Sequence, residues 1–403
     1  MTTAGYTRGS SNYRRVSMAL FAAGFATFSL LYDVQPLLPA FPREFHVSAA
    51  ESSLALSLST GFLALAILLA GAASESLGRR GLMFASICAA AILDIAAGLA
   101  PNWHWLLAAR ALEGLALGGV PAVGMAYLGE EIAPGDLGRA MGLFVAGNAF
   151  GGMVGRVGVG VLAAWSSWRL SVVALGGLDL CIALGFLALL PPSRNFTRHP
   201  RLDVGYHLQA WRDHLANPRL RRLFLVGFLV MGVFVTVYNY TGFRLQAPPY
   251  NLGQGQASAI FVVYLFGMAA SWTAGALADR LGRGPVLMAG SLIAAAGLAL
   301  TMAGPLPAVI GGVVVLTVGF FIAHSVASGW VGPMAADSKA HAASLYLLAY
   351  YLGSSLLGSI GGVFWNLGGW SAVTAFCATL LAGVFLAALR LRKGAAPRRT
   401  LLT

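Results

Sequence analysis

The sequence predicts an all-α membrane protein with twelve transmembrane helices in two pseudo-symmetric six-helix bundles. Three observations support this fold class. Of the 403 residues, 58% are hydrophobic and only 10% are charged, a balance that water-soluble domains do not show. Apolar runs of about 18 or more residues recur along the chain, and each is long enough to cross a hydrocarbon core as a helix. A loop motif also occurs twice, once in each half of the chain.

Charged and Pro/Gly-rich breaks divide the chain into twelve candidate spans. Their expected starts lie at about residues 16, 51, 81, 103, 137, 168, 222, 255, 284, 306, 340 and 369. The first apolar run follows Arg14 and Arg15 as in a signal peptide. It continues through Asp33 to Pro39 without a small-residue cleavage site, so we expect it to be retained as the first span.

Basic residues gather in alternate loops, and this asymmetry predicts the orientation of the chain. One side carries Arg8, Arg14, Arg15, Arg79, Arg80, Arg139, Arg280, Arg283, Lys339, the arginines between residues 191 and 222, and the basic carboxyl-terminal tail. The other side carries only Arg43, Arg169 and Arg244. We therefore expect cytoplasmic amino and carboxyl termini in a bacterial inner (plasma) membrane. The net charge of +12 follows from this distribution and does not indicate nucleic-acid binding.

The longest polar break runs from about Pro191 to Leu220 and follows the sixth span. We expect a first bundle over residues 1–190, a cytoplasmic linker over 191–220, and a second bundle with a basic cytoplasmic tail over 221–403. The linker arginines are interpreted as orientation signals that contact anionic lipid head groups. Cys88, Cys181 and Cys377 all lie in apolar segments, so neither a disulfide framework nor a metal site or other cofactor is expected.

A short motif repeats at equivalent places in the two halves. The loop after the second span reads Gly71-Ala-Ala-Ser-Glu75-Ser-Leu-Gly78-Arg79-Arg80, and the loop after the eighth reads Gly275-Ala-Leu-Ala-Asp279-Arg280-Leu-Gly282-Arg283. An internal duplication accounts for the repeat. The glycines permit a tight turn between antiparallel spans, and the arginines anchor the turn at the membrane surface.

These loops resemble the signature of the major facilitator superfamily, G-x-L-A-D-R-x-G-R-[RK], which lies between spans two and three. The resemblance covers the whole chain and implies transport of a small solute by alternating access. In that family the loop locks the cytoplasmic side of the outward-open state. The first copy has Glu75 in place of Asp and Ser76 in place of Arg, which implies a weaker or differently partnered lock. The alternative is that both loops only anchor the topology.

Six ionisable residues fall inside predicted spans: Asp33, Asp94, Arg110, Glu113, Arg156 and Asp179. Each costs roughly 2.5 to 3.5 kcal/mol at mid-bilayer, so it needs a partner, water or a proton. Counting from the span ends places Asp33, Arg110 and Arg156 in one layer, about 10 Å below the outer surface. Glu113 lies one helical turn from Arg110 and is expected to pair with it. For Asp94 and Asp179 we expect structural hydrogen bonds.

Two segments resemble motifs of proton-driven transporters. Residues 106–114 are similar to the span-four motif R-x-x-Q-G, with Glu113 in place of Gln, and the resemblance implies a role for Arg110 in proton coupling. Residues 31–39 are similar to the span-one acidic motif of the drug/arabinose efflux (drug:proton antiporter) branch. We hypothesise that Asp33 carries the proton, because burial disfavours its charged form and Arg110 favours it. The alternative is a permanent ion pair that only holds the bundle together.

The fifth span contains part of the antiporter motif G-x8-G-x3-G-P-x2-G-G. Gly138, Gly147 and Gly151 align with it, but Gly152 takes the proline position and Arg156 that of the last glycine. We expect this glycine face to pack closely against the other half of the chain. Arg156 instead suits an anionic substrate, so a proton symporter or facilitator for a small anionic metabolite is the alternative function.

Polar and aromatic residues of several spans are candidates for a central substrate cavity. They are Tyr32, Asn148, Arg156, Tyr238, Tyr240, Trp272, His324, Tyr346 and Tyr350. Aromatic faces bind apolar or cationic solutes, although each of these side chains also suits packing. His324 is a second candidate for a titrating group.

The sequence as a whole favours proton-coupled efflux of a small organic molecule, such as a drug or sugar, by a monomer in the bilayer. The remaining alternative is a non-transporting membrane sensor or an enzyme. The sequence argues against both, because it offers no soluble domain, no nucleophile elbow and no metal-ligand cluster.

Overall fold

The computed structural model describes residues 5–196, 204–335 and 337–393, without the side chains of residues 71–77, 204 and 393. Its regular elements in these ranges are helices, apart from an isolated β-bridge between Tyr6 and Ile132. Eleven helical segments in these ranges are long and apolar enough to span a membrane. The last of them, α16 (Lys339–Lys393), consists of two helices merged across a kink at Gly368 and Gly369. With this break the described residues contain the twelve spans that the sequence predicts.

The helices follow the predicted order, and each predicted start lies within a few residues of the observed one. The first six spans comprise α1 (Ser11–Tyr32) with η1 (Gln35–Leu37), α4 (Leu54–Leu77), α5 (Arg79–Gly98), α6 (Trp103–Leu117) with α7 (Pro121–Glu131), α8 (Pro134–Trp165) and α9 (Trp168–Leu189). Short helices α2 (Phe41–Phe45) and α3 (Ala49–Ser52) join α1 to α4. The others are α10 (Val204–Ala216), α11 (Pro218–Gln246), α12 (Gln254–Ser258) with η2 (Ala259–Val263), α13 (Tyr264–Leu281), α14 (Arg283–Leu300), α15 (Leu306–Met334) and α16.

Backbone contacts divide the chain into two compact units. Unit 1 comprises Met1–Asp203, Tyr238–Val262 and Gly358–Asn366, and unit 2 comprises Val204–Val237, Val263–Leu357 and Leu367–Thr403. The units do not coincide with the expected segments 1–190 and 221–403, because the end of α11, α12 and part of α16 pack onto the first six spans. The bounds expected for the two bundles and the linker stay a prediction.

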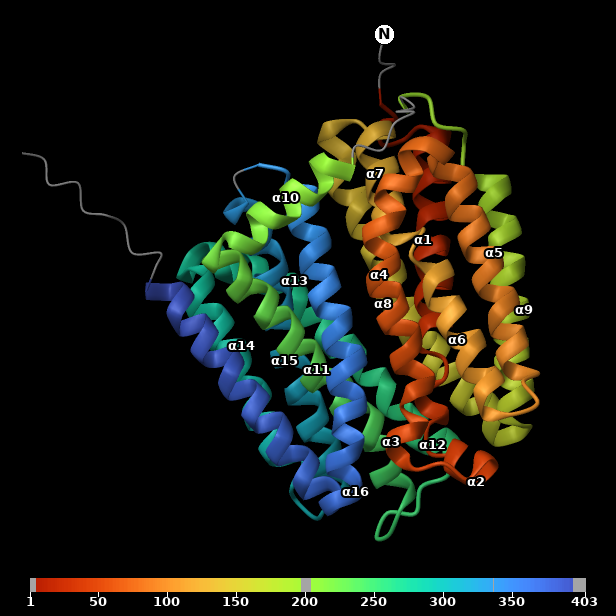
Figure 1. Ribbon diagram of the computed structural model, residues 1–403, viewed down its shortest axis with the longest axis vertical. Helices are drawn as coiled ribbons and strands as arrows, with labels where there is room; N and C mark the ends of the chain where they lie inside the picture. Colours follow the sequence, from red (N-terminus) through yellow and green to blue (C-terminus); the bar gives the residue numbers. More distant parts are fainter. Residues whose placement is uncertain (1–4, 197–203, 336, 394–403) are drawn as a thin grey trace, which may run out of the picture. The chain divides into compact units, whose positions relative to one another are not determined.

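Helix α1 is the central element of unit 1. It packs against α8 and α9, while α6 packs against α4 and α5 (Figure 1). Most side chains of α1 are buried, including Val16, Leu20 and Leu30, although Met18 is exposed. A helix that is apolar on all faces is stable only when it is enclosed. The carboxyl-terminal end of α1, where Asp33 follows, therefore lies inside the protein.

Glycines on α8 allow α1 to approach closely. A Cβ atom on Gly147 or Gly151 would overlap the backbone of Phe21 or Phe25, both on α1. The expectation that this glycine face packs against the other half is therefore wrong for these two residues, because their close contacts are with a helix of the same half. Only further along α8, at Gly160, does a glycine face the second half of the sequence, through Ser258 of α12.

The repeated loop has the same backbone conformation in both copies. Gly78 precedes α5 and Gly282 precedes α14, and both have φ 89° and ψ 146°. Side-chain-bearing residues rarely adopt this conformation, so the turn requires glycine at both places. The equality at equivalent positions supports the inferred duplication.

The segment expected to be a plain linker contains helix α10. Residues of this helix pack against the start of α16 within unit 2. The rings of His207 and His341 are 5.1 Å apart, and their nitrogens Nδ1 and Nε2 are 2.8 Å apart. Trp211 also contacts the ring of His341. The sequence predicts a linker here and does not predict this helix.

Candidate functional site

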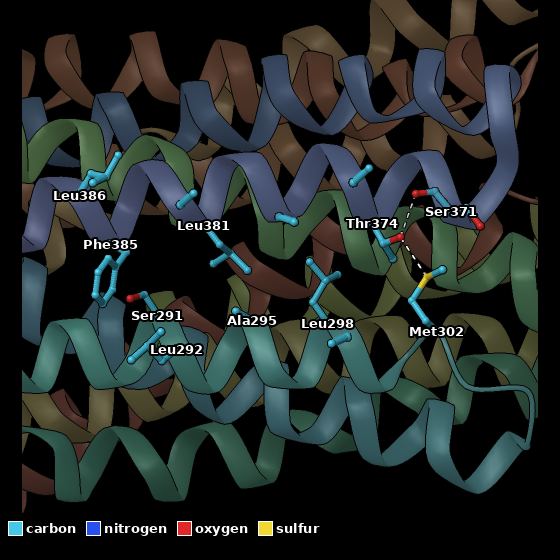
Figure 2. Close-up of a pocket in the computed structure, with 14 residues that line it drawn as sticks. Ser291, Leu292, Ala295, Leu298, Met302, Ser371, Thr374, Leu381, Phe385 and Leu386 are labelled. Atoms are coloured by element: carbon cyan, nitrogen blue, oxygen red, sulfur yellow. Dashed lines mark hydrogen bonds between the residues drawn. The ribbon is translucent and has the colours of Figure 1, made fainter.

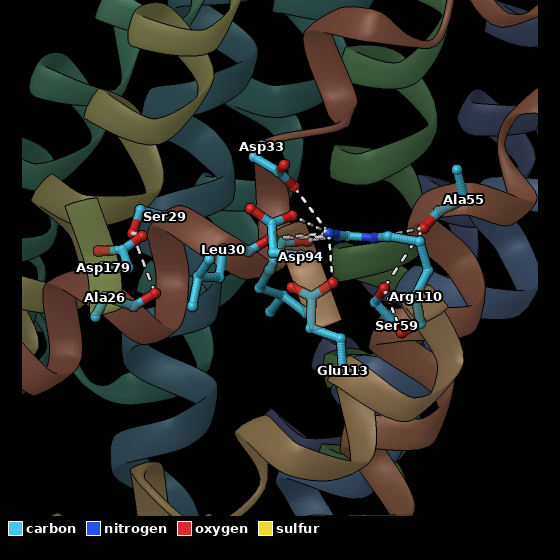
Figure 3. A network of polar contacts seen from close by, with 11 residues as sticks. Ala26, Ser29, Leu30, Asp33, Ala55, Ser59, Asp94, Arg110, Glu113 and Asp179 are labelled. Carbon is cyan, nitrogen blue, oxygen red and sulfur yellow. Dashed lines mark hydrogen bonds and ion pairs between the residues drawn. The ribbon is translucent and has the colours of Figure 1, made fainter. Parts of the chain in front are cut away.

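An ionic cluster lies inside unit 1, where the guanidinium of Arg110 faces three carboxyl groups (Figure 3). Its Nη1 lies 3.0 Å from Asp33 Oδ1, 3.3 Å from Asp94 Oδ1 and 2.7 Å from Glu113 Oε2. Asp33 follows α1, Asp94 lies on α5, and the other two lie on α6. All four side chains are 0% exposed. These four residues are called the Arg110 cluster below.

The end of α1 also binds the guanidinium. Carbonyl groups in the last turn of a helix lack partners within the helix. The carbonyl oxygens of Leu30 and Leu31 accept hydrogen bonds from Arg110 Nη2 at 3.3 and 3.0 Å, and that of Ala55 on α4 accepts one from Nε at 3.2 Å. The partial negative charge of a helix carboxyl terminus favours a cation at this place. Main-chain atoms therefore anchor Arg110 independently of the carboxyl groups.

The structure brings together the three residues that the sequence assigned to proton coupling, Asp33, Arg110 and Glu113. Asp94 was missed as a member of this cluster, since only a structural hydrogen bond was expected for it. Its position near the middle of a span gave its depth but not the direction in which it points. Asp179 does accept a hydrogen bond from Ser29 Oγ, at 2.8 Å.

Arg156 lies in a second polar group of unit 1. Its Nε donates to Gln35 Oε1 at 2.5 Å, and Gln35 Nε2 donates to Asn239 Oδ1 at 2.8 Å. The guanidinium lies over the ring of Tyr32, 3.9 Å from its centroid. Arg156 as a whole is 2% exposed. Because Tyr32 and Gln35 lie within two residues of Asp33 in sequence, this group adjoins the Arg110 cluster along the chain. The common layer of Asp33, Arg110 and Arg156 stays a prediction.

The other cavity candidates of unit 1 make packing contacts. Tyr238 stacks on Phe261 with centroids 5.4 Å apart, and Tyr240 donates to the Gly358 carbonyl at 3.1 Å. Asn148 packs against α1 beside Gly24, and its Oδ1 is buried without a hydrogen-bond partner. A role in substrate binding stays a prediction for these three.

The candidates in unit 2 divide into an aromatic cluster and an exposed tryptophan. His324 Nδ1 lies 3.1 Å from the Tyr346 hydroxyl, and the His324 ring centroid lies 4.6 Å from that of Tyr350. The ring of Phe320, which also lies on α15, stacks on the ring of His324. Trp272, on α13, is 91% exposed. The structure thus joins three of these four residues in one place.

An apolar groove of about 630 Å³ lies in unit 2, between α14 and the last span of α16 (Figure 2). Its lining includes Leu292, Leu298, Leu381 and Phe385. Because its lining contains no ionisable side chain, we assign it no part in proton coupling.

The repeated loops differ in their contacts. In the first copy, Arg79 forms an ion pair of 2.7 Å with Glu130 at the end of α7, and Arg80 donates to the Leu187 carbonyl at 2.5 Å. In the second copy, Gly275, Asp279 and Arg280 are exposed, while Arg283 is half-buried. Gly71 and Glu75 belong to the stretch whose side chains lie outside the description. The role of both loops as gates stays a prediction.

The described residues contain twelve apolar spans, and unit 1 encloses a buried ionic cluster, as expected of a polytopic membrane protein. Residues 16–272 match the Major Facilitator Superfamily, and the chain belongs to this family. It is 43% identical to the inner membrane transport protein YnfM of Escherichia coli (strain K12) over 390 residues, which cover 96% of this chain and 92% of that protein. It is 42% identical to the uncharacterized MFS-type transporter YybF of Bacillus subtilis (strain 168) over 374 residues, 93% of this chain and 92% of that one.

A solved structure of similar fold is that of a mutant of the nucleoside transporter NupG. It matches with a TM-score of 0.75 at 14% identity, over 94% of this chain and 99% of that chain. This likeness shows the fold alone.

Proposed function

We propose that this protein exports a small organic molecule in exchange for protons, and that Asp33 is the proton-carrying residue. The observation that carries the proposal is the ion pair of 3.0 Å between Asp33 and Arg110, both fully buried in a chain of a transporter family. A carboxylate inside a membrane protein requires a cation, water or a proton. Asp33 has a cation in Arg110, and it gains access to water and protons when the site opens to water.

The anchoring of Arg110 supports an exchange mechanism. A proton on Asp33 removes its charge and weakens its attraction to α6, while the main-chain carbonyls keep the guanidinium in place. Loss of the proton restores the attraction. Because Asp33 ends the central helix α1, its charge is coupled to the helix that packs against α8 and α9. Proton binding then favours one arrangement of these helices and proton release favours another.

The setting proposed for this exchange is the bacterial inner membrane, with both termini in the cytoplasm and a monomer as the working unit. The arginine distribution supports the orientation, and the printed description of YnfM as an inner membrane protein supports the location. The aromatic side chains of Tyr238, Tyr240, Tyr346 and Tyr350 are proposed to contact the solute, and the repeated loops to close the cytoplasmic side.

The replacement Asp33→Asn tests this function. Candidate solutes are first identified by a toxicity screen in an efflux-deficient host that expresses the intact chain. In proteoliposomes, we expect Asp33→Asn to lose transport driven by a pH gradient but to retain solute exchange without a gradient. Asp136→Asn is the matched control, because Asp136 begins α8 and accepts a hydrogen bond from the exposed Arg8 amide. Gradient-driven transport by Asp33→Asn at the intact rate would refute the carrier role.

Arg156 favours a second function, proton symport or facilitated passage of a small anionic metabolite. It is a buried cation that donates hydrogen bonds to Gln35 and to the Gly152 carbonyl, and a planar guanidinium is well suited to bind an anionic group. Imposed pH gradients of opposite sign distinguish the two functions. Export by antiport requires acid on the side that receives the solute, whereas symport requires acid on the side that supplies it.

A further inference from the structure

The charges of the Arg110 cluster do not balance if every group is ionised. Asp33, Asp94 and Glu113 contribute three negative charges, and Arg110 contributes one positive charge. All four side chains are fully buried. Uncompensated charge in such surroundings is strongly unfavourable, and a carboxyl group avoids the cost by binding a proton. Neutrality of the cluster requires two protons.

Hydrogen-bond counting leads to the same requirement. Arg110 Nη1 has two hydrogens but faces four oxygens, those of the three carboxyl groups and the Leu30 carbonyl, at 2.7 to 3.3 Å. The second oxygens of Asp33 and Asp94, both named Oδ2, are buried without a hydrogen-bond partner, and so are both oxygens of Glu113. A protonated carboxyl group supplies a donor that an ionised one lacks.

Asp33 and Asp94 are the two residues that best accommodate these protons. Both place an oxygen on the same nitrogen, Asp33 Oδ1 at 3.0 Å and Asp94 Oδ1 at 3.3 Å from Arg110 Nη1, so the two carboxyl groups are neighbours. Two neighbouring carboxyl groups share a hydrogen bond only when at least one carries a proton. Glu113 Oε2 makes the shortest approach to Nη1, 2.7 Å, without hydrogen-bond geometry, so we assign Glu113 as the group that compensates the guanidinium by its charge.

Two other ionisable residues border this pair. Asp179 on α9 binds Ser29, one turn before Asp33, and Arg156 on α8 lies over Tyr32. Helix α4 contacts Arg110 through the Ala55 carbonyl, which accepts from Nε, and through the Ser59 hydroxyl, which donates to the Arg110 carbonyl at 2.9 Å.

We propose that Asp94 is a second proton-carrying residue and that the Asp33–Asp94 pair holds two protons while Glu113 is the lasting counter-ion of Arg110. The inference rests on the proposed proton coupling at Asp33 and extends it to α5. Each cycle then moves two protons, which the pair binds when it faces acid and releases to the opposite side. Because the two carboxyl groups repel each other once both are ionised, release of the first proton and release of the second are linked.

Infrared difference spectroscopy tests the proposal without a known solute. The full chain is reconstituted in lipid, and a step from acidic to alkaline buffer is applied. Protonated carboxyl groups are recognised by a carbonyl band that shifts in deuterium oxide. Asp179→Asn serves as the parent, so that this other buried acid does not contribute. We expect the parent to lose a band that corresponds to two groups per chain, calibrated against protein concentration.

Replacement of Asp94 should halve that band. Asp94→Asn added to the parent is expected to show about half the amplitude, Asp94→Glu the full amplitude, and Asp136→Asn the full amplitude. An undiminished band in Asp94→Asn, or a parent band of only one group, would overturn the proposal. The parent measurement decides the question even if the Asp94 variants fail to fold.

The outcome is separable from that of the proposed function. If Asp33→Asn retains gradient-driven transport, the coupling role of Asp33 fails, but the infrared amplitude still reports whether Asp94 carries a proton. If the coupling role holds and the band of Asp94→Asn is undiminished, only the second proton is refuted.

Discussion

Arg110 makes contacts that no other side chain reproduces. Its planar guanidinium donates to Leu31 and Ala55 carbonyls while it faces three carboxyl groups. Lysine presents a single ammonium and cannot span these acceptors. The positive charge alone therefore does not define the site, because the directions of the donors matter as well.

The replacement Arg110→Lys is expected to abolish transport and to lower thermal stability in detergent. Complete removal of the charge by Arg110→Ala leaves buried acids without a cation, and we expect a loss of about 3–5 kcal/mol. Arg79→Lys is the control, because its partner Glu130 is partly exposed and the pair contributes at most about 1 kcal/mol. Melting curves by thiol-reactive fluorescence give the comparison. Equal curves for Arg110→Lys and Arg79→Lys would contradict the prediction.

At this scale the sequence predicted partners where spacing fixes them. The separation of Glu113 from Arg110 places both on one helix face, and depth placed Asp33 at the same level. Asp94 was not predicted as a partner, because each residue step rotates a helix position by about 100°, and depth does not reveal which neighbour a side chain meets. Only the packing of α5 against α6 places it beside Arg110.

Among the elements, the pairing of α1 with α8 depends on glycine. The backbones approach so closely at Gly151 that a methyl group would overlap Phe25. Small residues play this part in membrane bundles, where packing replaces the hydrophobic effect between helices. The position of Asp33 at the end of α1 therefore depends on a contact two turns away.

Gly151→Ala is expected to destabilise the protein by about 1–3 kcal/mol, the usual cost of overpacking. Gly158→Ala on the same helix is the control, since an added methyl there meets nothing within 4 Å. We expect that control to be neutral or slightly stabilising, because alanine favours a helix over glycine. Reversible unfolding in mixed micelles measures both. A smaller loss for Gly151→Ala than for Gly158→Ala would show that the two helices separate easily.

Helix starts were largely predictable from charged and Pro/Gly-rich breaks, because apolar length limits where a span begins. The helix that packs against the glycine face of α8 was not predictable from the sequence. A small-residue pattern shows that another backbone comes close, but it does not show which one. Helix α10 was missed because it lies within the longest polar break of the chain. Its contact through His207 and Trp211 with His341 exists only in the folded chain.

For the whole molecule, the distribution of arginine predicts a definite topology. We expect a fluorescent protein fused to the carboxyl terminus to fluoresce, because it folds in the cytoplasm. Alkaline phosphatase inserted after Asn251, between α11 and α12, is expected to be active, because that enzyme requires the oxidising side of the membrane. If a phosphatase fused to the carboxyl terminus were active instead, the orientation of the chain would be opposite to the predicted one.

The duplication is the feature of the whole fold that the sequence revealed most directly. It was visible as two similar loops, and the structure shows the same backbone angles at Gly78 and Gly282. The division by contacts into units 1 and 2 was not predictable, because it depends on which parts of α11, α12 and α16 adhere to the first six spans in this conformation.

The anchor of Arg110 has a consequence for how such a chain tolerates sequence drift. Its acceptors at Leu30, Leu31 and Ala55 are peptide oxygens, which every amino acid supplies. Changes of the side chains at these three places leave the oxygens intact, whereas a single base change removes an acid. A descendant that no longer couples to protons would thus be recognised by its missing carboxyl groups, with its arginine still in position.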